Sequence, residues 1–283
     1  MIVVSAASGA FGRLVIDQLL ARRPADRVVA AVRNPNGAVD LAARGVHVRL
    51  GDYDDPATLR TAFKGADRLL LISSPELEPY RRARQHQAAI DAARAAGVGS
   101  IAYTSFLGAD TQADGVTAAH HSTERTLLAS GLPHTLLRHP FYSEAFLNPG
   151  LHAAVASGEL ADGTGGRGIN TAFRSDLAEA AARVLTEDCH IGRAYDFTGS
   201  LWTYNQLAHA LSRISGKPVA HRDRHDRAPG VQGWLEEQVR AGALEQQTDD
   251  LEHVLGHPVT TLDQAVTAIL TQPAPPTAGP ALE

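Results

Sequence analysis

Short apolar runs alternate with segments of helical periodicity through the first half of this 283-residue chain, and no other feature restricts its fold as strongly. Between the first two runs, apolar residues from Phe11 to Leu19 recur at the spacing of one helix face. Parallel strands need helical crossovers and are covered on both faces, so the alternation predicts a Rossmann-type, doubly wound parallel α/β sheet. The expected strands are 2–5, 28–32, 46–50, 68–73, 100–104 and 134–137.

Glycine and proline replace this alternation after about Pro140, and a smaller C-terminal α/β lobe is expected from there. It would contain helices at 175–187 and 203–215, with a strand at 193–198 between them. The end of the chain is rich in Pro, Thr and Ala, which predicts disorder. The expected parts are a dinucleotide-binding domain at 1–140, to which later segments can return, a substrate lobe at 141–271 and a disordered tail at 272–283.

Composition favours small-molecule chemistry over nucleic-acid binding, since the net charge is −5. No apolar stretch approaches the ~18 residues of a membrane span, and Met1 is followed by the first strand rather than by a signal peptide. A single cysteine, Cys189, excludes an internal disulfide and a cysteine-based zinc site. We therefore expect a cytoplasmic protein that binds no nucleic acid, membrane or metal, with a homodimer as an open alternative for its assembly.

The turn between the first expected strand and helix reads Ser5-Ala6-Ala7-Ser8-Gly9-Ala10-Phe11-Gly12. In a Rossmann fold the cofactor pyrophosphate lies here, because backbone N–H groups and the helix dipole stabilise its charge. Gly9 and Gly12 occupy two glycine positions of this motif, and Ala6 stands at the first. The alternative is a plain strand-to-helix turn, but its place in a βαβ unit favours dinucleotide binding.

Arg33 follows the second strand, where NAD-preferring domains usually carry an acidic residue that bonds the ribose. An arginine suits the 2'-phosphate of NADPH, and a solvated surface arginine is the alternative. After the third strand, Asp52 and Tyr53 can bond and flank the adenine. An aspartate that caps its own turn is an equally good reading of Asp52.

Several separate segments carry a resemblance to a known family. They are 8–12, 32–35, 51–53, 70–74, 102–105, His120 with Thr123 and Glu124, 135–138 with Tyr142, and 256–262. The chain resembles the NmrA-like atypical short-chain dehydrogenases, in particular the branch of NAD(P)H:quinone oxidoreductases and triphenylmethane reductases. This resemblance implies an NADPH-binding domain, a small C-terminal lobe and an aromatic substrate in the cleft between them.

From these motifs and this resemblance, one set of residues is expected to bind the cofactor NADPH and a smaller set is expected to bind the substrate. Phe106, Phe141 and Tyr142 follow strand ends, where open α/β sheets bind ligands, and are expected to stack on an aromatic substrate. Core packing is the alternative for all three, especially for Phe141. Trp234 is expected to form a lid or to anchor a helix. The cofactor residues are Ala6, Ser8, Gly9, Ala10, Phe11, Gly12, Arg33, Asp52, Tyr53, Ser73, Ser74, Thr104, Pro140 and Phe141, and the substrate residues are Phe106, Tyr142 and Trp234.

The Tyr-x-x-x-Lys pair, which protonates an alkoxide in ordinary short-chain dehydrogenases, is absent, because neither Lys64 nor Lys217 lies four residues after a tyrosine. This favours transfer of hydride to a quinone or a related polycyclic aromatic, whose charge is delocalised. His120 is the candidate for assisting the chemistry, with a surface or capping histidine as the alternative. A redox-neutral enzyme and a non-catalytic nucleotide sensor remain alternative functions for this scaffold.

Overall fold

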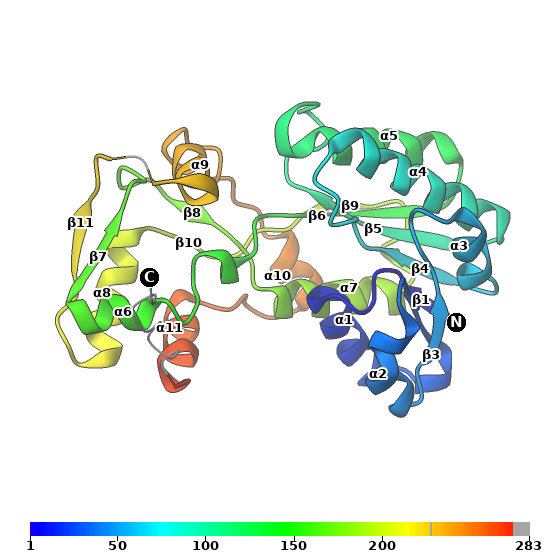
Figure 1. Ribbon diagram of the computed structural model, residues 1–283, viewed down its shortest axis with the longest axis horizontal. Coiled ribbons are helices and arrows are strands. Elements are labelled where there is room, and N and C mark those ends of the chain that lie inside the picture. Colours follow the sequence, from blue (N-terminus) through cyan, green and yellow to red (C-terminus); the bar gives the residue numbers. More distant parts are fainter. Residues whose placement is uncertain (227, 274–283) are drawn as a thin grey trace, which may run out of the picture. The chain divides into compact units, whose positions relative to one another are not determined.

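The computed structural model describes residues 1–226 and 228–273 and divides into two compact units (Figure 1). The first consists of Met1–His139, Arg174–Phe197 and Asp249–His257, and the second of Pro140–Phe173, Thr198–Thr248 and the described residues from 258 onward. Two segments beyond residue 140 therefore return to the first unit. Of the predicted tail, residues 274–283 lie outside the described residues.

Seven strands, each parallel to its neighbours, form the sheet of the first unit in the order β3-β2-β1-β4-β5-β6-β9. The chain runs from β1 outward to β2 and β3 and then crosses to β4 on the other side of β1. The carboxyl ends of β1 and β4 thus form the switch point where such sheets bind ligands. The strands are β1 (Ile2–Val4), β2 (Val28–Val32), β3 (His47–Leu50), β4 (Arg68–Leu71), β5 (Ser100–Phe106), β6 (His134–His139) and β9 (Ala194–Asp196).

Helices cover both faces of this sheet, as the alternation predicted. Figure 1 shows α3 (Pro56–Phe63), α4 (Pro79–Ala95) and α5 (Ala118–Ser130) on one face, and α1 (Ala10–Leu20), α2 (Val39–Ala43) and α7 (Arg174–Thr186) on the other. Helix α10 (Asp250–Leu255) packs against α7. The core beneath the first face includes Val3, Leu69, Phe63, Ile90 and Tyr103, which are all fully or almost fully buried. The predicted doubly wound fold is confirmed.

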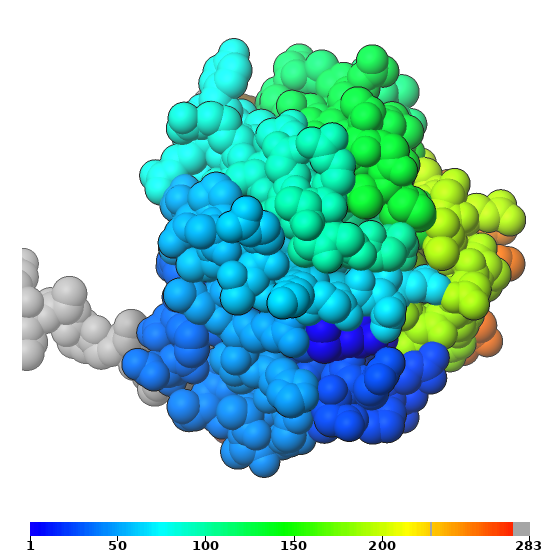
Figure 2. Space-filling view, turned by 90° about the vertical axis from the view of Figure 1, so that its right-hand side faces the viewer, coloured from blue at the N-terminus to red at the C-terminus, as the bar shows by residue number. Residues whose placement is uncertain are grey.

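The segment expected to supply a helix and a strand to the second lobe instead completes the first unit. Helix α7 packs beside α1, and β9 pairs with β6 through Leu136 and Ala194. In Figure 2 this segment, coloured yellow-green, adjoins the blue and green residues of the first unit. Local periodicity predicted that this segment contains a helix and a strand, and both are present. It could not predict which sheet the strand joins, because that depends on the unpaired edge of β6, which lies far away in the sequence.

The second unit is smaller and carries two short sheets around its own core. Strands β7 (Glu159–Asp162) and β11 (Ala220–Asp223) are parallel, and β8 (Ile169–Asn170) and β10 (Leu201–Trp202) are antiparallel. Buried Trp202, Leu207, Leu211 and Val266 contribute to the core. The helices are α6 (Leu151–Ser157), α8 (Tyr204–Ser215), α9 (Gly230–Arg240) and α11 (Leu262–Thr271).

Strands β5 and β6 are longer than the sequence predicted, ending at Phe106 and His139 rather than at residues 104 and 137. They pair along six residues, from Ile101 opposite His134 to Phe106 opposite His139. The prediction ended the two strands just before the polar residues Ser105 and Arg138. Both are buried in the structure, where each donates a hydrogen bond to Glu124. No helix in the described parts of the chain is long and apolar enough to cross a membrane.

Candidate functional site

The turn after β1 lies at the switch point and suits an anionic ligand. Helix α1 begins after Gly9 without a side-chain cap and without an acidic residue in its first turn. The first N–H groups of a helix have no intrahelical acceptor, so this end can bind a phosphate. Of the predicted residues, Ser8, Gly9 and Ala10 are exposed, Ala6 is half-buried, and Phe11 and Gly12 are buried.

Ala6 and Gly12 determine the shape of this turn. Ala6 has a φ of +48°, the only positive φ of a non-glycine residue in the described chain. A Cβ atom on Gly12 would lie 2.7 Å from the Cα of Ala7 and 2.8 Å from the carbonyl oxygen of Ala6. Close packing of α1 against the turn therefore requires a glycine at position 12. At the first glycine position of the motif, Ala6 adopts a left-handed backbone although it is not a glycine.

Arg13 holds the turn to the loop after β2, a role that the sequence analysis missed. Its guanidinium donates to the carbonyl oxygens of Ser8 and Gly37, at 3.0 and 2.9 Å, and forms an ion pair with Asp40. The hydrogen bond from Arg13 lowers the pKa of the Asp40 carboxyl. An arginine after the last glycine of the motif was the available signal, but two of its partners, Gly37 and Asp40, lie 24 and 27 residues away.

Residues after β2 and β3 lie at the same carboxyl edge of the sheet. Arg33 is exposed immediately after β2. Asp52 accepts a hydrogen bond at 3.1 Å from the backbone N–H of Asp54, which is the turn-capping contact that the sequence left open. The Tyr53 hydroxyl is buried, 2.6 Å from the Ser5 hydroxyl and 2.5 Å from the carbonyl oxygen of Ile72. Burial raises the pKa of the Tyr53 phenol.

Ser73, Ser74 and Thr104 join the loop after β4 to β5 and α4. The backbone N–H of Ser73 donates to the Thr104 hydroxyl at 2.8 Å, and the Ser74 hydroxyl donates to the side-chain oxygen of Gln85 at 2.5 Å. The backbone N–H of Ser74 donates to Nε2 of His86 at 2.9 Å. These contacts fix the loop at the carboxyl end of β4, next to the switch point.

His120 is brought to the carboxyl end of β5 by the first turn of α5. It is 6% exposed, and its ring lies 5.9 Å from the ring of Phe106, centroid to centroid. Burial, together with the charge of Arg82, lowers the pKa of His120 to about 3. Nδ1 of His120 lies 2.9 Å from the Tyr103 hydroxyl. The histidine is therefore neutral at physiological pH and is not a surface residue.

The remaining predicted residues, Pro140, Phe141, Tyr142 and Trp234, belong to the second unit. The half-buried rings of Phe141 and Trp234 pack edge to face with their centroids 5.9 Å apart. This contact fits the reading of Trp234 as the anchor of α9. Tyr142 is half-buried, and its backbone forms an isolated parallel β-bridge with Ala172.

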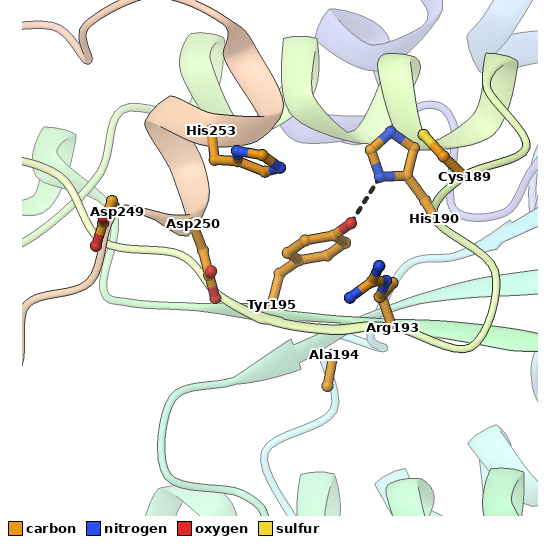
Figure 3. A pocket seen from close by; sticks show the side chains of 8 residues that line it. All are labelled: Cys189, His190, Arg193, Ala194, Tyr195, Asp249, Asp250 and His253. Carbon is orange, nitrogen blue, oxygen red and sulfur yellow. Dashed lines mark hydrogen bonds between the residues drawn. The ribbon is translucent and has the colours of Figure 1, made fainter.

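A separate cavity of about 480 Å³ lies beside edge strand β9 of the first unit (Figure 3). Within it, Nδ1 of His190 and the Tyr195 hydroxyl are 2.7 Å apart. None of the predicted site residues lines it. The residues that line it are Cys189, His190, Arg193, Ala194, Tyr195, Asp249, Asp250 and His253.

Comparison with known proteins gives concordant matches. A family model described as NAD(P)H-binding matches residues 6–188. Quinone oxidoreductase 2 of Escherichia coli (strain K12) is 41% identical over 281 residues, which cover 94% of this chain and 97% of that protein.

Two solved structures resemble the chain over nearly their whole length. Triphenylmethane reductase of Citrobacter sp. complexed with NADP(H) superposes with a TM-score of 0.89 at 34% identity, covering 95% of this chain and 100% of that one. NADPH-dependent quinone oxidoreductase of Escherichia coli complexed with NADPH superposes with a TM-score of 0.86 at 41% identity, again covering 95% and 100%.

Proposed function

Because this chain belongs to the NAD(P)H-binding family, we propose that it is an NADPH-dependent reductase that transfers hydride to a quinone or a related polycyclic aromatic acceptor. The observation that carries the proposal is the 41% identity to quinone oxidoreductase 2 along 97% of that protein. The match covers both units, so it includes the region that would recognise an acceptor as well as the dinucleotide-binding sheet.

The residues at the switch point fit the cofactor. The uncapped N-terminus of α1 suits the pyrophosphate, and the absence of a side chain on Gly12 lets the helix approach the turn. Exposed Arg33 suits the 2'-phosphate, which supports NADPH over NADH. When bound, the reduced nicotinamide supplies the hydride.

A quinone is the acceptor that this chain is best equipped to reduce. The Tyr-x-x-x-Lys pair is absent from the sequence, so an alkoxide formed from a simple ketone would lack a prepared proton donor. A hydroquinone anion spreads its charge over a ring and takes protons from water. Positioning of the two reactants, with Phe106 and His120 against the acceptor, supports this reaction without a strong acid.

The other substrate residues and the location belong to the same proposal. Tyr142 and Trp234 are proposed to contact the aromatic acceptor, and Tyr142→Ala should raise KM more than it lowers kcat.

A cytoplasmic location is proposed because one cysteine suits a reducing compartment.

The experiment is steady-state oxidation of NADPH, followed by its absorbance, with 1,4-naphthoquinone and with acetophenone as acceptors. We expect rapid turnover with the quinone and slow turnover with the ketone, and reactions without acceptor are the control. Tight NADPH binding with no turnover on any quinone would instead indicate a nucleotide sensor. Faster turnover of the ketone would refute the proposal.

A further inference from the structure

Four buried polar side chains form a connected group behind the carboxyl ends of β4 and β5, and the proposed function uses only one of them. They are His86 of α4, Tyr103 of β5, and His120 and Thr123 of α5, which are 0%, 0%, 6% and 2% exposed. Polar groups buried this deeply are costly unless each donor meets an acceptor. Their contacts therefore determine where each proton lies.

Both histidines are neutral. Burial is the main cause that lowers the pKa of each to about 3, and the Arg82 guanidinium on α4 contributes to both shifts. A neutral imidazole carries one proton, on Nδ1 or on Nε2, and the partner of one nitrogen decides the state of the other. The other titratable groups that face this cluster are Glu124 of α5, which is ion-paired with Arg138, and His139 of β6.

The proton of His86 is on Nδ1. A backbone N–H can only donate, so its 2.9 Å contact from Ser74 makes Nε2 of His86 the acceptor. Nδ1 then donates to the Thr123 hydroxyl at 2.8 Å, and Thr123 donates its own proton to the carbonyl oxygen of Ala119 at 2.7 Å. Nδ1 of His86 thus has no lone pair for the Tyr103 hydroxyl, which is 3.4 Å away.

Nδ1 of His120, 2.9 Å from the Tyr103 hydroxyl, is the imidazole nitrogen that can accept its proton. Burial raises the pKa of Tyr103, so the phenol keeps its proton. The hydroxyls of Thr123 and Ser73 also lie within hydrogen-bonding reach of the phenol oxygen, and Nδ1 of His120 can take its proton. A neutral His120 that accepts at Nδ1 carries its own proton on Nε2. Nε2 makes no hydrogen bond to any residue that the structure describes, so its N–H is available to a ligand.

We propose that Tyr103 is a positioning residue that fixes His120 as its Nε2–H tautomer, so that a neutral imidazole donates a hydrogen bond to the acceptor oxygen on which negative charge develops. This inference rests on the proposed reductase function and deepens it. As hydride bonds to the quinone ring, the electron pair moves to that oxygen. That oxygen then takes a proton from water, the ring carbon that received hydride loses a proton to water, and the second oxygen takes one as the aromatic hydroquinone forms. His120 keeps its own proton.

A donor fixed before the reaction stabilises the transition state without reorganisation. A neutral imidazole is too weak an acid to transfer a proton readily, but it polarises a carbonyl group well, as in triosephosphate isomerase. The pH dependence separates the two roles. A hydrogen-bonding His120 predicts kcat/KM with quinone that does not fall as pH rises through 6.5, whereas a protonated histidine acting as an acid would lose activity there.

The test is long-range 1H–15N spectroscopy of the histidine side chains in the full chain without added substrate, with His120→Gln used to assign the signals. We expect the Nε2–H pattern for His120 in the unmodified protein. Tyr103→Phe should produce a mixture of tautomers and lower kcat/KM with 1,4-naphthoquinone on the order of tenfold, less than the ~10²-fold typical of a lost donor. The Kd of NADPH should not change.

Tyr195→Phe is the matched control, because it removes a tyrosine–histidine hydrogen bond of the same kind from the cavity in Figure 3. It should alter neither the His120 tautomer nor turnover. An Nδ1–H pattern for His120 in the unmodified protein overturns this inference even if Tyr103→Phe fails to fold. Absence of quinone turnover in the unmodified protein would instead refute the proposed function, which keeps the two failures distinct.

Discussion

The carbonyl oxygen of Ala6 lies 2.8 Å from the position that a Cβ atom would occupy on Gly12. Real Cβ atoms do not approach backbone this closely, so any side chain at position 12 must displace the turn. Gly9 differs, because its Cβ would lie 3.3 Å from the same oxygen and its φ of −71° suits any residue. Gly12 is therefore required for packing, and Gly9 is proposed to give a ligand access to the turn.

Gly9→Val should abolish NADPH binding while the protein stays folded, because the side chain would fill the space before the α1 N-terminus. Gly12→Ala should instead lower the free energy of unfolding by about 1–3 kcal/mol through overpacking. Calorimetric titration with NADPH and urea unfolding of both variants check this. NADPH binding that survives in Gly9→Val would remove this turn from the cofactor site.

Ala6→Gly should stabilise the protein. A left-handed backbone costs a non-glycine residue about 1–3 kcal/mol, whereas glycine costs roughly 0.5–1 kcal/mol in lost chain entropy. With φ at +48° the substitution should raise the free energy of unfolding by about 0.5–1 kcal/mol. Ala7→Gly, at a neighbouring position outside the positive-φ set, is the control and should destabilise. Equal losses in both variants would show that Ala6 is not strained.

Arg33 should determine cofactor preference. One charge-assisted contact with the 2'-phosphate should make NADPH bind at least tenfold tighter than NADH, which corresponds to about 1.4 kcal/mol. Arg33→Ala should equalise the two Kd values by weakening NADPH alone. Arg60→Ala, at an exposed residue of α3, should change neither. Equal affinities in the unmodified protein would contradict the prediction.

Three buried histidines should make the protein sensitive to mild acid. Burial lowers the pKa values of His86, His120 and His139 to about 3 from an ordinary 6.5. Between these values the unfolded chain binds more protons, so the stability contribution is complete above pH 6.5 and is lost as pH falls below it. Each histidine should cost about 1.4 kcal/mol per pH unit.

Urea unfolding at several pH values between 6.5 and 5 measures this slope. His120→Gln should reduce the number of protons taken up on unfolding by about one. His253→Gln, at an exposed histidine, should leave the slope unchanged. A slope that is the same in both variants would show that His120 is not buried in its neutral form.

Glu124 and Arg138 should be the most sensitive ion pair in the molecule's first unit. Their bidentate contact, at 2.9 and 2.8 Å, is buried, and the hydrogen bond that Arg138 donates to Glu124 is the main cause that raises the pKa of Arg138. Glu124→Ala leaves a buried charge and should cost about 3–5 kcal/mol. Asp110→Ala removes a half-exposed partner of the same arginine, 3.2 Å away, and should cost less than about 1 kcal/mol by urea unfolding.

Much of the architecture was accessible from the sequence because it depends on local order. Alternating runs predicted the strands and crossovers, the position of Gly9 and Gly12 predicted the turn, and the absence of a Tyr-x-x-x-Lys pair favoured a quinone as acceptor. Local periodicity also found the strand at 193–198. It assigned that strand to the wrong unit, since pairing with β6 connects residues 58 positions apart, as between Arg138 and Asp196.

Apolar periodicity and glycine spacing are properties of neighbouring residues, so they predicted six of the seven strands of the sheet and the glycine-containing turn after β1. The family followed from the resemblance of several separate segments. Only the tertiary packing brought His86, Thr123, Tyr103 and His120 together as one buried polar group. Each of these residues is polar and looks ordinary in the sequence, and periodicity predicts only which helix face is buried. Which polar side chains meet beneath that face depends on how α4 and α5 pack on β5, and burial then determines their protonation.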